Sequence, residues 1–212
     1  MTDVRGVISD FGGVLTSPLL DAFSSIQESS GISVEDLGKA MFALAGRLGV
    51  NPLIELETGR MTETDFLEAL GVQLSQQLGR HVQMEGFGEA YFESLSPNLP
   101  MIEYMRELRD RGYRMAICTN NVREWEQRWR SMLPVDEIFD VVVDSAFIGS
   151  RKPEPEIYQV TLERLRIPAA ACLFIDDVEV NCDGARQAGM RAVQFRDSEQ
   201  ARREIETALN GA

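Results

Sequence analysis

The chain has 212 residues, enough for one domain and a smaller insertion, and a net charge of −13. Its hydrophobic content of 44% and charged content of 26% are typical of an ordinary globular protein. No lysine- or arginine-rich run concentrates positive charge, which argues against nucleic acid as a partner. No apolar stretch reaches transmembrane length and the start does not resemble a signal peptide, so we expect no membrane partner.

The three cysteines are an odd number and lie in sequence contexts that indicate burial or helix: Cys118, Cys172 and Cys182. An odd set without regular spacing does not form a disulfide framework. We therefore expect reduced thiols and a cytoplasmic location.

The first predicted element is a short apolar strand within Val4–Thr16 that carries Asp10 to its carboxyl end and breaks at Gly12 and Gly13. An apolar run bounded by turn residues is typical of a strand buried in a parallel sheet. Ligands bind such sheets just beyond the carboxyl ends of the strands. A buried carboxylate there is costly unless it is paired, bound to metal or used in catalysis.

Residues 17–96 show helical periodicity and no convincing strand, so we expect an all-helical insertion after the first strand. Ser33 is a plausible N-cap for one helix, and Asn51-Pro52 starts another. The predicted helical segments are 18–26 (with Leu19, Leu20, Phe23 and Ile26 at helical spacing), 34–48, 52–57, a long helix from 62 and 84–95.

From residue 97 the pattern alternates between strands and helices, which predicts an α/β fold with a doubly wound parallel sheet built from residues 1–16 and 97–212. The predicted strands are 113–118, 138–144, 171–175 and 191–195. The predicted helices are 100–111, 122–131, 155–164, 180–188 and 198–209.

Polar residues follow several of these strands: Thr119 and Asn120 after one, and Asp176 and Asp177 after another. Adjacent carboxylates repel each other, so we expect a cation nearby. Asp10 and Asp177 can share Mg²⁺, which prefers oxygen ligands. Thr119 and Lys152, the latter in a loop before a helix, can hold an anionic group beside Asp10, which makes Asp10 a competent nucleophile towards phosphorus.

Four motifs carry a resemblance to the haloacid dehalogenase superfamily of hydrolases: Asp10-Phe-Gly-Gly-Val-Leu, Thr119-Asn120, Lys152-Pro-Glu-Pro and Phe174-Ile-Asp-Asp-Val-Glu-Val-Asn181. Residues 17–96 fall at the position of that family's helical C1 cap, and the resemblance implies a Rossmann-like core. Within residues 57–66, Glu57-Thr-Gly-Arg-Met-Thr-Glu-Thr-Asp-Phe66 resembles the branch of glucose-1-phosphatase-like proteins and the N-terminal phosphatase domain of soluble epoxide hydrolases.

The resemblance implies a role for each motif residue. Asp10 is the nucleophile that becomes an aspartyl phosphate. Thr119 and Lys152 bind the phosphoryl group, and Asn120 contacts the substrate. The Mg²⁺ ligands are Asp10, Asp177, the carbonyl of Gly12 and, directly or through water, Asp176. The implied partner is a small phosphorylated metabolite, and the protein is a monomer or a homodimer.

The sequence departs from the family pattern at Gly12, where its phosphatases usually carry an aspartate that acts as general acid and base. Glycine has no proton to give, which predicts slow turnover, a preference for good leaving groups or a substitute base. Two alternatives stay open: a metal-independent 2-haloacid dehalogenase, and a protein that binds a phosphorylated ligand or partner without efficient turnover. The acidic pair Asp176-Asp177 favours the phosphatase over the dehalogenase.

Overall fold

The computed structural model describes residues 3–18 and 31–210. The helix predicted over 18–26, with Leu19, Leu20, Phe23 and Ile26, lies almost entirely outside the described residues. Among the described residues no helix combines the length and the apolar character needed to cross a membrane.

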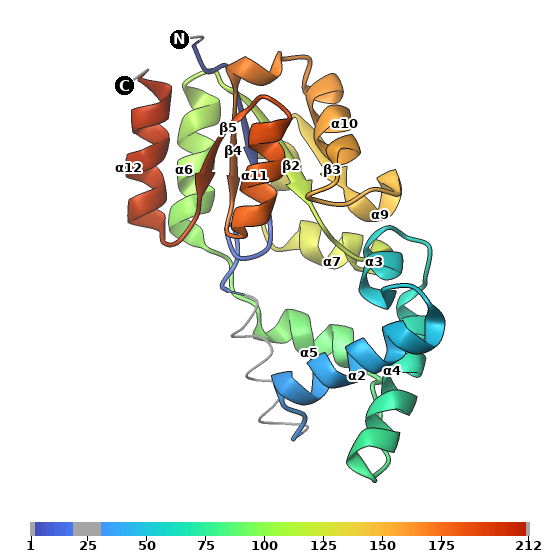
Figure 1. Ribbon diagram of the computed structural model, residues 1–212. Helices are drawn as coiled ribbons and strands as arrows, with labels where there is room; N and C mark the ends of the chain where they lie inside the picture. Colours follow the sequence, from blue (N-terminus) through green and yellow to red (C-terminus); the bar gives the residue numbers. More distant parts are fainter. Residues whose placement is uncertain (1–2, 19–30, 211–212) are drawn as a thin grey trace.

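A five-stranded sheet forms the centre of the molecule, and all its neighbouring strands pair in parallel, as predicted (Figure 1). The strand order is β3-β2-β1-β4-β5. The strands are β1 Gly6–Ser9, β2 Arg114–Thr119, β3 Val141–Asp144, β4 Cys172–Asp176 and β5 Arg191–Gln194. Ser9 of the central β1 lies opposite Ile117 of β2 and Ile175 of β4, so the residues after these three strands emerge at one edge.

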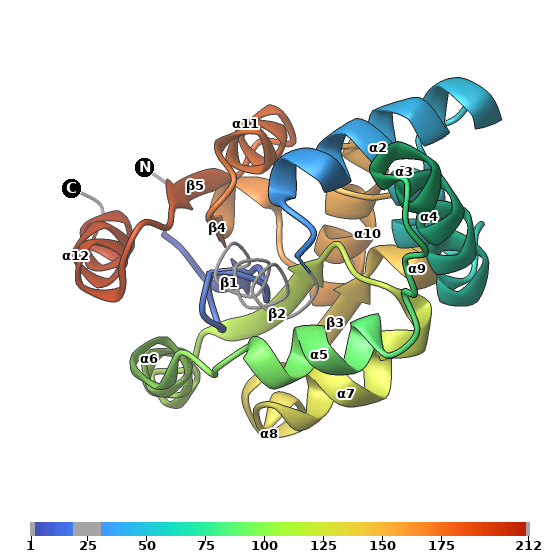
Figure 2. The ribbon, with the colours of Figure 1, turned by 90° about the horizontal axis from the view of Figure 1, so that it is seen from below.

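Helices cover both faces of the sheet (Figure 2). Side chains alternate along β1: Val7 belongs to the apolar core shared with α6, α7, α8 and α12, and Ile8 to the core shared with α10 and α11. These helices are α6 Leu99–Asp110, α7 Glu126–Ser131, α8 Val135–Ile138, α10 Pro155–Leu165, α11 Glu179–Gln187 and α12 Ser198–Leu209. Short elements complete the layers: η1 Arg123–Trp125, α9 Ser145–Ile148 and η2 Ala169–Ala171.

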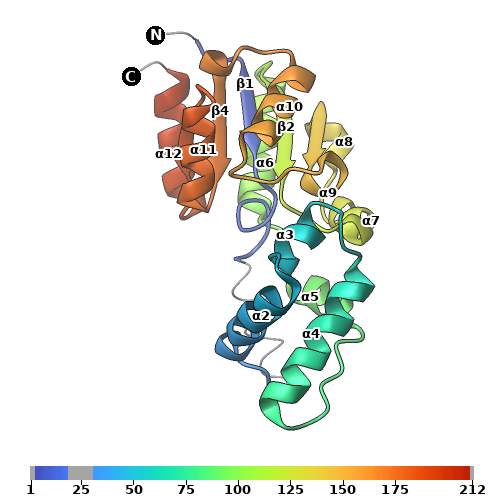
Figure 3. The ribbon, with the colours of Figure 1, turned by 45° about the vertical axis from the view of Figure 1, so that its right-hand side comes forward.

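Among the described residues, four inserted helices lie between β1 and α6 and project beyond the carboxyl ends of the strands (Figure 3). They are α2 Val34–Leu48, α3 Pro52–Glu57, α4 Glu63–Leu78 and α5 Phe87–Ser94. Their apolar faces form a core of their own around Leu44, Leu56 and Leu74. The N-cap predicted at Ser33 is confirmed, since its side chain accepts a hydrogen bond from the first turn of α2. The helix predicted to start at Asn51-Pro52 is also confirmed, and the Asn51 side chain caps it in the same way.

The chain enters and leaves this block through two segments that lie against each other. Thr16 and Pro97 form an isolated antiparallel bridge. The backbone N–H of Ser17 donates to the carbonyl of Ser96 over 2.7 Å, and the Ser96 N–H donates to Oγ of Ser17 over 3.1 Å. The inserted helices are therefore joined to the core by two connecting segments that are hydrogen-bonded to each other.

Two local predictions were wrong at their edges, and one short helix was not predicted. Helix α5 begins at Phe87, not at residue 84, because Gly86 takes a left-handed conformation (φ 76°) before it. The strand predicted from residue 138 begins at Val141, because residues 135–138 after Pro134 form helix α8. The four-residue α9 was not predicted; it begins at Ser145, where the Asp144 side chain accepts from the N–H of Ala146.

Candidate active site

The carboxyl ends of three adjacent strands bring the predicted site residues together. Asp10 follows β1, Thr119 ends β2 and Asp176 ends β4. Because β1 lies between β2 and β4 in parallel register, these distant segments meet at the same edge of the sheet. Lys152 comes from the loop before α10, and Asp177 is the residue after β4.

Lys152 is the electrostatic centre of this cluster, with a side chain only 1% exposed. Its Nζ lies 2.7 Å from Oδ1 of Asp10 and 2.6 Å from Oδ2 of Asp176. Burial by itself lowers the pKa of Lys152, but the two carboxylates outweigh it and raise that pKa above its ordinary value. Lys152 therefore stays positively charged beside Asp10, the predicted nucleophile.

Burial raises the pKa of Asp10 to about 7, against the opposing charge of Lys152 and with a further rise from Asp176. Burial and the charge of Asp176 also raise the pKa of Asp177. The cluster thus holds more negative charge than one lysine can neutralise.

The three carboxylates can meet at one cation. Asp10, Asp176 and Asp177 each offer an oxygen within 4.8 Å of the others. Three carboxylates against one ammonium leave two uncompensated negative charges, which a hard divalent ion such as Mg²⁺ balances with oxygen ligands. The donor set therefore fits the predicted metal.

Gly13 leaves the space that Asp177 occupies. A Cβ built at Gly13 would lie 2.5 Å from Oδ2 of Asp177, and the Gly13 backbone has φ +75°. The backbone conformation favours glycine, and a side chain at this position would displace the Asp177 carboxylate. The break predicted at Gly12-Gly13 thus has a specific purpose: the loop after β1 passes directly against an acidic residue after β4.

Asp176 is fixed from three directions. Its Oδ1 accepts from the N–H of Val178 and from Nδ2 of Asn181, each over 2.9 Å, while its Oδ2 faces Lys152. These bonds hold the carboxylate in one orientation, which in turn fixes the Lys152 ammonium. Asn181 is a supporting residue that sequence reasoning did not single out, although it lies within the fourth motif.

The side chain of Asn120 is hydrogen-bonded to the backbone of Lys152. The Asn120 side-chain oxygen accepts from the Lys152 N–H over 2.8 Å, and its amide NH₂ donates to the Lys152 carbonyl over 3.0 Å. The Asn120 amide therefore holds the lysine loop against β2. Thr119, 1% exposed, donates from its hydroxyl to the Asn120 carbonyl over 3.5 Å.

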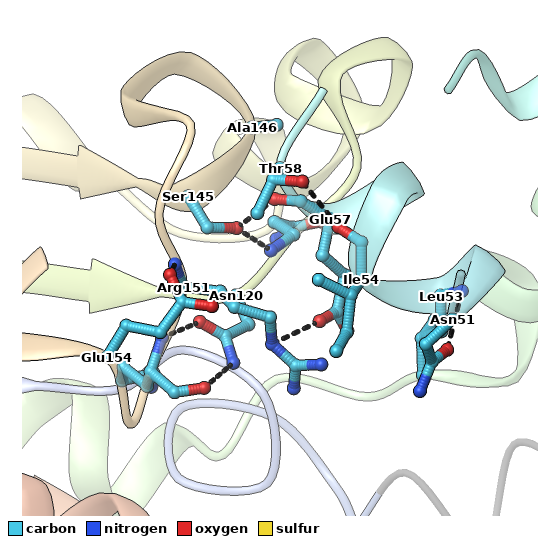
Figure 4. Close-up of polar contacts among 12 residues, drawn as sticks. Asn51, Leu53, Ile54, Glu57, Thr58, Asn120, Ser145, Ala146, Arg151 and Glu154 are labelled. Carbon is cyan, nitrogen blue, oxygen red and sulfur yellow. Dashed lines mark hydrogen bonds and ion pairs between the residues drawn. The ribbon is translucent and has the colours of Figure 1, made fainter. Parts of the chain in front are cut away.

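The inserted helix α3 contacts the core beside this site (Figure 4). Oγ of Ser145 donates to the Glu57 carbonyl over 2.5 Å and accepts from the N–H of Asn121 over 3.0 Å. Oε2 of Glu57 forms an ion pair with Nε of Arg151 over 2.9 Å, and burial raises the Glu57 pKa. Sequence reasoning did not find these contacts, because Glu57, Ser145 and Arg151 carry no motif that links them.

A cavity of about 430 Å³ opens beside the cluster, between the core and the inserted helices. Gly12, Thr119 and Asn120 line its core side. Most of its other described lining residues are apolar and come from α2–α5 and from Val122 and Trp125. His81, the single histidine, is exposed and lines a different cavity along α4.

Comparison with known proteins places this site in context. Residues 4–189 match the family model described as haloacid dehalogenase-like hydrolase. The chain is 30% identical to the phosphatase MT3486 of Mycobacterium tuberculosis, over 94% of this chain and 90% of the relative. It is 26% identical to bifunctional epoxide hydrolase 2 of Sus scrofa, over 96% of this chain but 38% of that protein.

The chain also covers only 19% of acyl-CoA dehydrogenase family member 10 of Mus musculus, to which it is 30% identical over 97% of its own length. Two of these three relatives are thus much longer proteins. Among solved structures, a HAD family enzyme of Bacteroides thetaiotaomicron in complex with magnesium and inorganic phosphate superposes with a TM-score of 0.70 at 20% identity, over 91% of this chain and 94% of that one.

Proposed function

Because the chain belongs to the haloacid dehalogenase-like hydrolases, we propose that it is a Mg²⁺-dependent phosphatase that hydrolyses a small phosphomonoester through an aspartyl phosphate at Asp10. The observation that carries this proposal is one buried cluster, in which Lys152 contacts Asp10 and Asp176 and a third carboxylate, Asp177, lies beside them. A nucleophilic carboxylate, a fixed cation and a set of oxygen ligands are the parts that phosphoryl transfer needs.

Asp10 begins the reaction. Its Oδ1 accepts from the Phe11 N–H over 2.7 Å and faces Lys152, so we assign Oδ2 to the attack on phosphorus. The new bond joins Oδ2 to phosphorus, and the bond between phosphorus and the ester oxygen breaks, so its electron pair leaves on the alkoxide, which takes a proton from water. A second water then attacks the phosphorus, the bond between phosphorus and Oδ2 breaks with its electron pair returning to Asp10, and both protons of that water leave with the inorganic phosphate.

Lys152 and Thr119 hold the phosphoryl oxygens during both steps. Lys152 is placed by Asp176 and by the Asn120 clamp, so its charge needs no rearrangement as negative charge develops. Asp10, Asp176, Asp177 and the Gly12 carbonyl would hold Mg²⁺. When bound, this ion supplies Lewis-acid stabilisation of the transferring group.

Gly12 limits the turnover rate that we expect of the enzyme. No carboxyl group stands at this position to protonate the departing alcohol, a contribution worth about 10²–10⁴ in rate. We therefore propose slow turnover of alkyl phosphates and faster turnover of esters with good leaving groups. The partner is a small phosphorylated metabolite and the setting the cytoplasm, in keeping with three buried, free cysteines. The oligomeric state is proposed as monomer or homodimer, with residues 17–96 acting as the cap.

The test is phosphate release from p-nitrophenyl phosphate with Mg²⁺ and with excess chelator. We expect release only with Mg²⁺, and only background release from Asp10→Asn. The matched control is Asp3→Asn, an exposed aspartate close to β1 that should retain full activity. Activity that survives both the chelator and Asp10→Asn would contradict the proposal, and halide release from 2-chloropropionate in chelator would select the dehalogenase instead.

A further inference from the structure

The cavity lined by Gly12 and Thr119 extends from the catalytic cluster to the inserted helices. In the proposed function, the leaving group of the substrate projects away from Asp10, and this cavity is the space that meets Thr119 and Asn120. At about 430 Å³ it lies within the range of small-ligand sites. Its chemistry therefore bears on which alcohol the enzyme releases.

The wall combines aliphatic and aromatic side chains. Met41, Leu56 and Leu70 come from three different inserted helices. Tyr91 and Trp125 stack with ring centroids 5.0 Å apart, and Phe92 meets Trp125 edge-on at 5.3 Å. The aliphatic side chains and ring faces of this wall gain free energy by covering apolar surface and form no hydrogen bonds with hydroxyl groups.

The polar groups on the wall are largely engaged with one another. The Asn120 amide is bonded to the Lys152 backbone, and Oδ1 of Asn121 accepts from the Val122 N–H over 2.9 Å. Two charged residues line the cavity among the described residues, Glu57 and Glu63. Glu57 pairs with Arg151, and Glu63 accepts from Nε1 of Trp125 over 2.7 Å.

A polyhydroxylated leaving group would have to exchange its hydrogen bonds to water for contacts with these walls and these engaged groups. Burial of an unpaired hydroxyl is unfavourable, whereas each buried methylene is worth about fourfold in affinity. The cavity therefore discriminates against sugar phosphates through its wall chemistry, independently of the phosphoryl site.

We infer that the cavity binds the alcohol part of the substrate and selects phosphate monoesters of apolar alcohols over phosphates of sugars and other polyols. This inference rests on the proposed function, since it assigns the cavity to the leaving group of that reaction. It adds a specificity that the cluster around Asp10 does not itself provide.

The test measures binding to the Asp10→Asn protein with Mg²⁺ by isothermal titration calorimetry, so it does not depend on turnover. The ligands are butyl, hexyl and octyl phosphate, with glucose 6-phosphate as a polar match for the six-carbon hexyl phosphate. We expect affinity to rise about fourfold per methylene until the cavity is filled, and hexyl phosphate to bind at least tenfold more tightly than glucose 6-phosphate. Equal affinity across the alkyl series, or tighter binding of glucose 6-phosphate, would overturn the inference.

Two variants locate the effect in the wall. Met41→Gln keeps the length of the side chain but adds an amide to the cavity, and should flatten the chain-length dependence. Phe42→Gln is the matched control, because Phe42 is the next residue of α2 and is 85% exposed. If both variants behave alike, the site of alkyl binding lies elsewhere and the inference fails. Turnover of p-nitrophenyl phosphate by the wild-type protein separately decides the proposed function.

Discussion

The Nζ of Lys152 lies 2.7 Å from Oδ1 of Asp10, in an ion pair that is almost completely shielded from solvent. The same ammonium lies 2.6 Å from Asp176. One cation thus neutralises part of the repulsion between two buried carboxylates and also stands where a phosphoryl group would meet Asp10. Stability and proposed catalysis depend on the same side chain.

Replacement of Lys152 by methionine should therefore lower both the stability of the fold and the phosphatase activity. Removal of one member of a buried ion pair leaves uncompensated charge and costs about 3–5 kcal/mol of unfolding free energy. We also expect Lys152→Met to reduce p-nitrophenyl phosphate turnover to background. Urea denaturation and the phosphatase assay check both expectations.

The control for this variant is Lys39→Met. Lys39 pairs with Glu35 on the surface of α2, with a side chain 62% exposed, and such exposed pairs contribute little to stability. A Lys152→Met protein as stable and active as this control would show that the buried pair has neither role.

Gly13→Ala should weaken the metal site. The new Cβ would lie 2.5 Å from Oδ2 of Asp177 and would force that carboxylate or the loop to move. We expect a rise of about tenfold or more in the Mg²⁺ concentration needed for half-maximal activity, a loss of roughly 1.4 kcal/mol in metal binding.

Gly49→Ala separates this contact from backbone strain. Gly49 has a similar positive φ of 72°, and nothing lies within 4 Å of a Cβ built there. Both variants should lose about 1 kcal/mol of stability through conformation, but only Gly13→Ala should alter the Mg²⁺ requirement. Equal Mg²⁺ requirements in the two proteins would refute the role of Gly13.

Asn120→Ala should loosen the lysine loop. The variant removes two hydrogen bonds to the Lys152 backbone, which together contribute about 1–3 kcal/mol. We expect lower stability and a tenfold or larger fall in kcat, measured by denaturation and steady-state kinetics. Asn210→Ala, at the exposed end of α12, is the control. An unchanged kcat in Asn120→Ala would show that the hydrogen bonds of Asn120 to Lys152 do not support catalysis.

Gly12→Asp tests the missing acid. A carboxyl group at this position should accelerate hexyl phosphate, whose leaving group needs a proton, by about 10²-fold relative to p-nitrophenyl phosphate. The measurement is the ratio of kcat/KM for the two substrates in wild type and variant. A ratio that stays constant would indicate that another group already supplies the proton.

Asp144 predicts a pH dependence of stability. Burial raises its pKa to about 6 in the folded protein, from an ordinary value of 3.8. Between these values the folded state keeps a proton that the unfolded state releases, so stability should fall as pH rises from about 4 to about 6 and stay lower above. The loss is on the order of 2–3 kcal/mol.

Asp144→Asn should remove this loss, because an amide oxygen can still accept from the Ala146 N–H without ionising. We expect the variant to be less sensitive than wild type over pH 4–6.5 in urea denaturation. Asp136→Asn, whose side chain is 91% exposed, should follow the wild-type profile. Parallel profiles for Asp144→Asn and wild type would contradict this prediction.

The sequence by itself determined the fold class and predicted which residues gather at the ends of the strands. Apolar runs that end in Asp10, Thr119 and Asp176 could be read directly, because a parallel sheet places each strand's end at the same edge. The helix caps at Ser33 and Asn51 were equally local signals. Where local signals were weak, as in the four-residue α9 and at the start of β3, the prediction failed.

Only the tertiary structure decided what these residues touch. Which carboxylates Lys152 reaches, why Gly13 lacks a side chain, and how Asn120 holds the lysine loop all depend on contacts between segments far apart in the chain. The cavity also depends on the tertiary structure, because residues of α2–α5 and residues after β1 and β2 line it together. Periodicity identifies which side chains are buried, but the space left between separately folded helices follows from their packing.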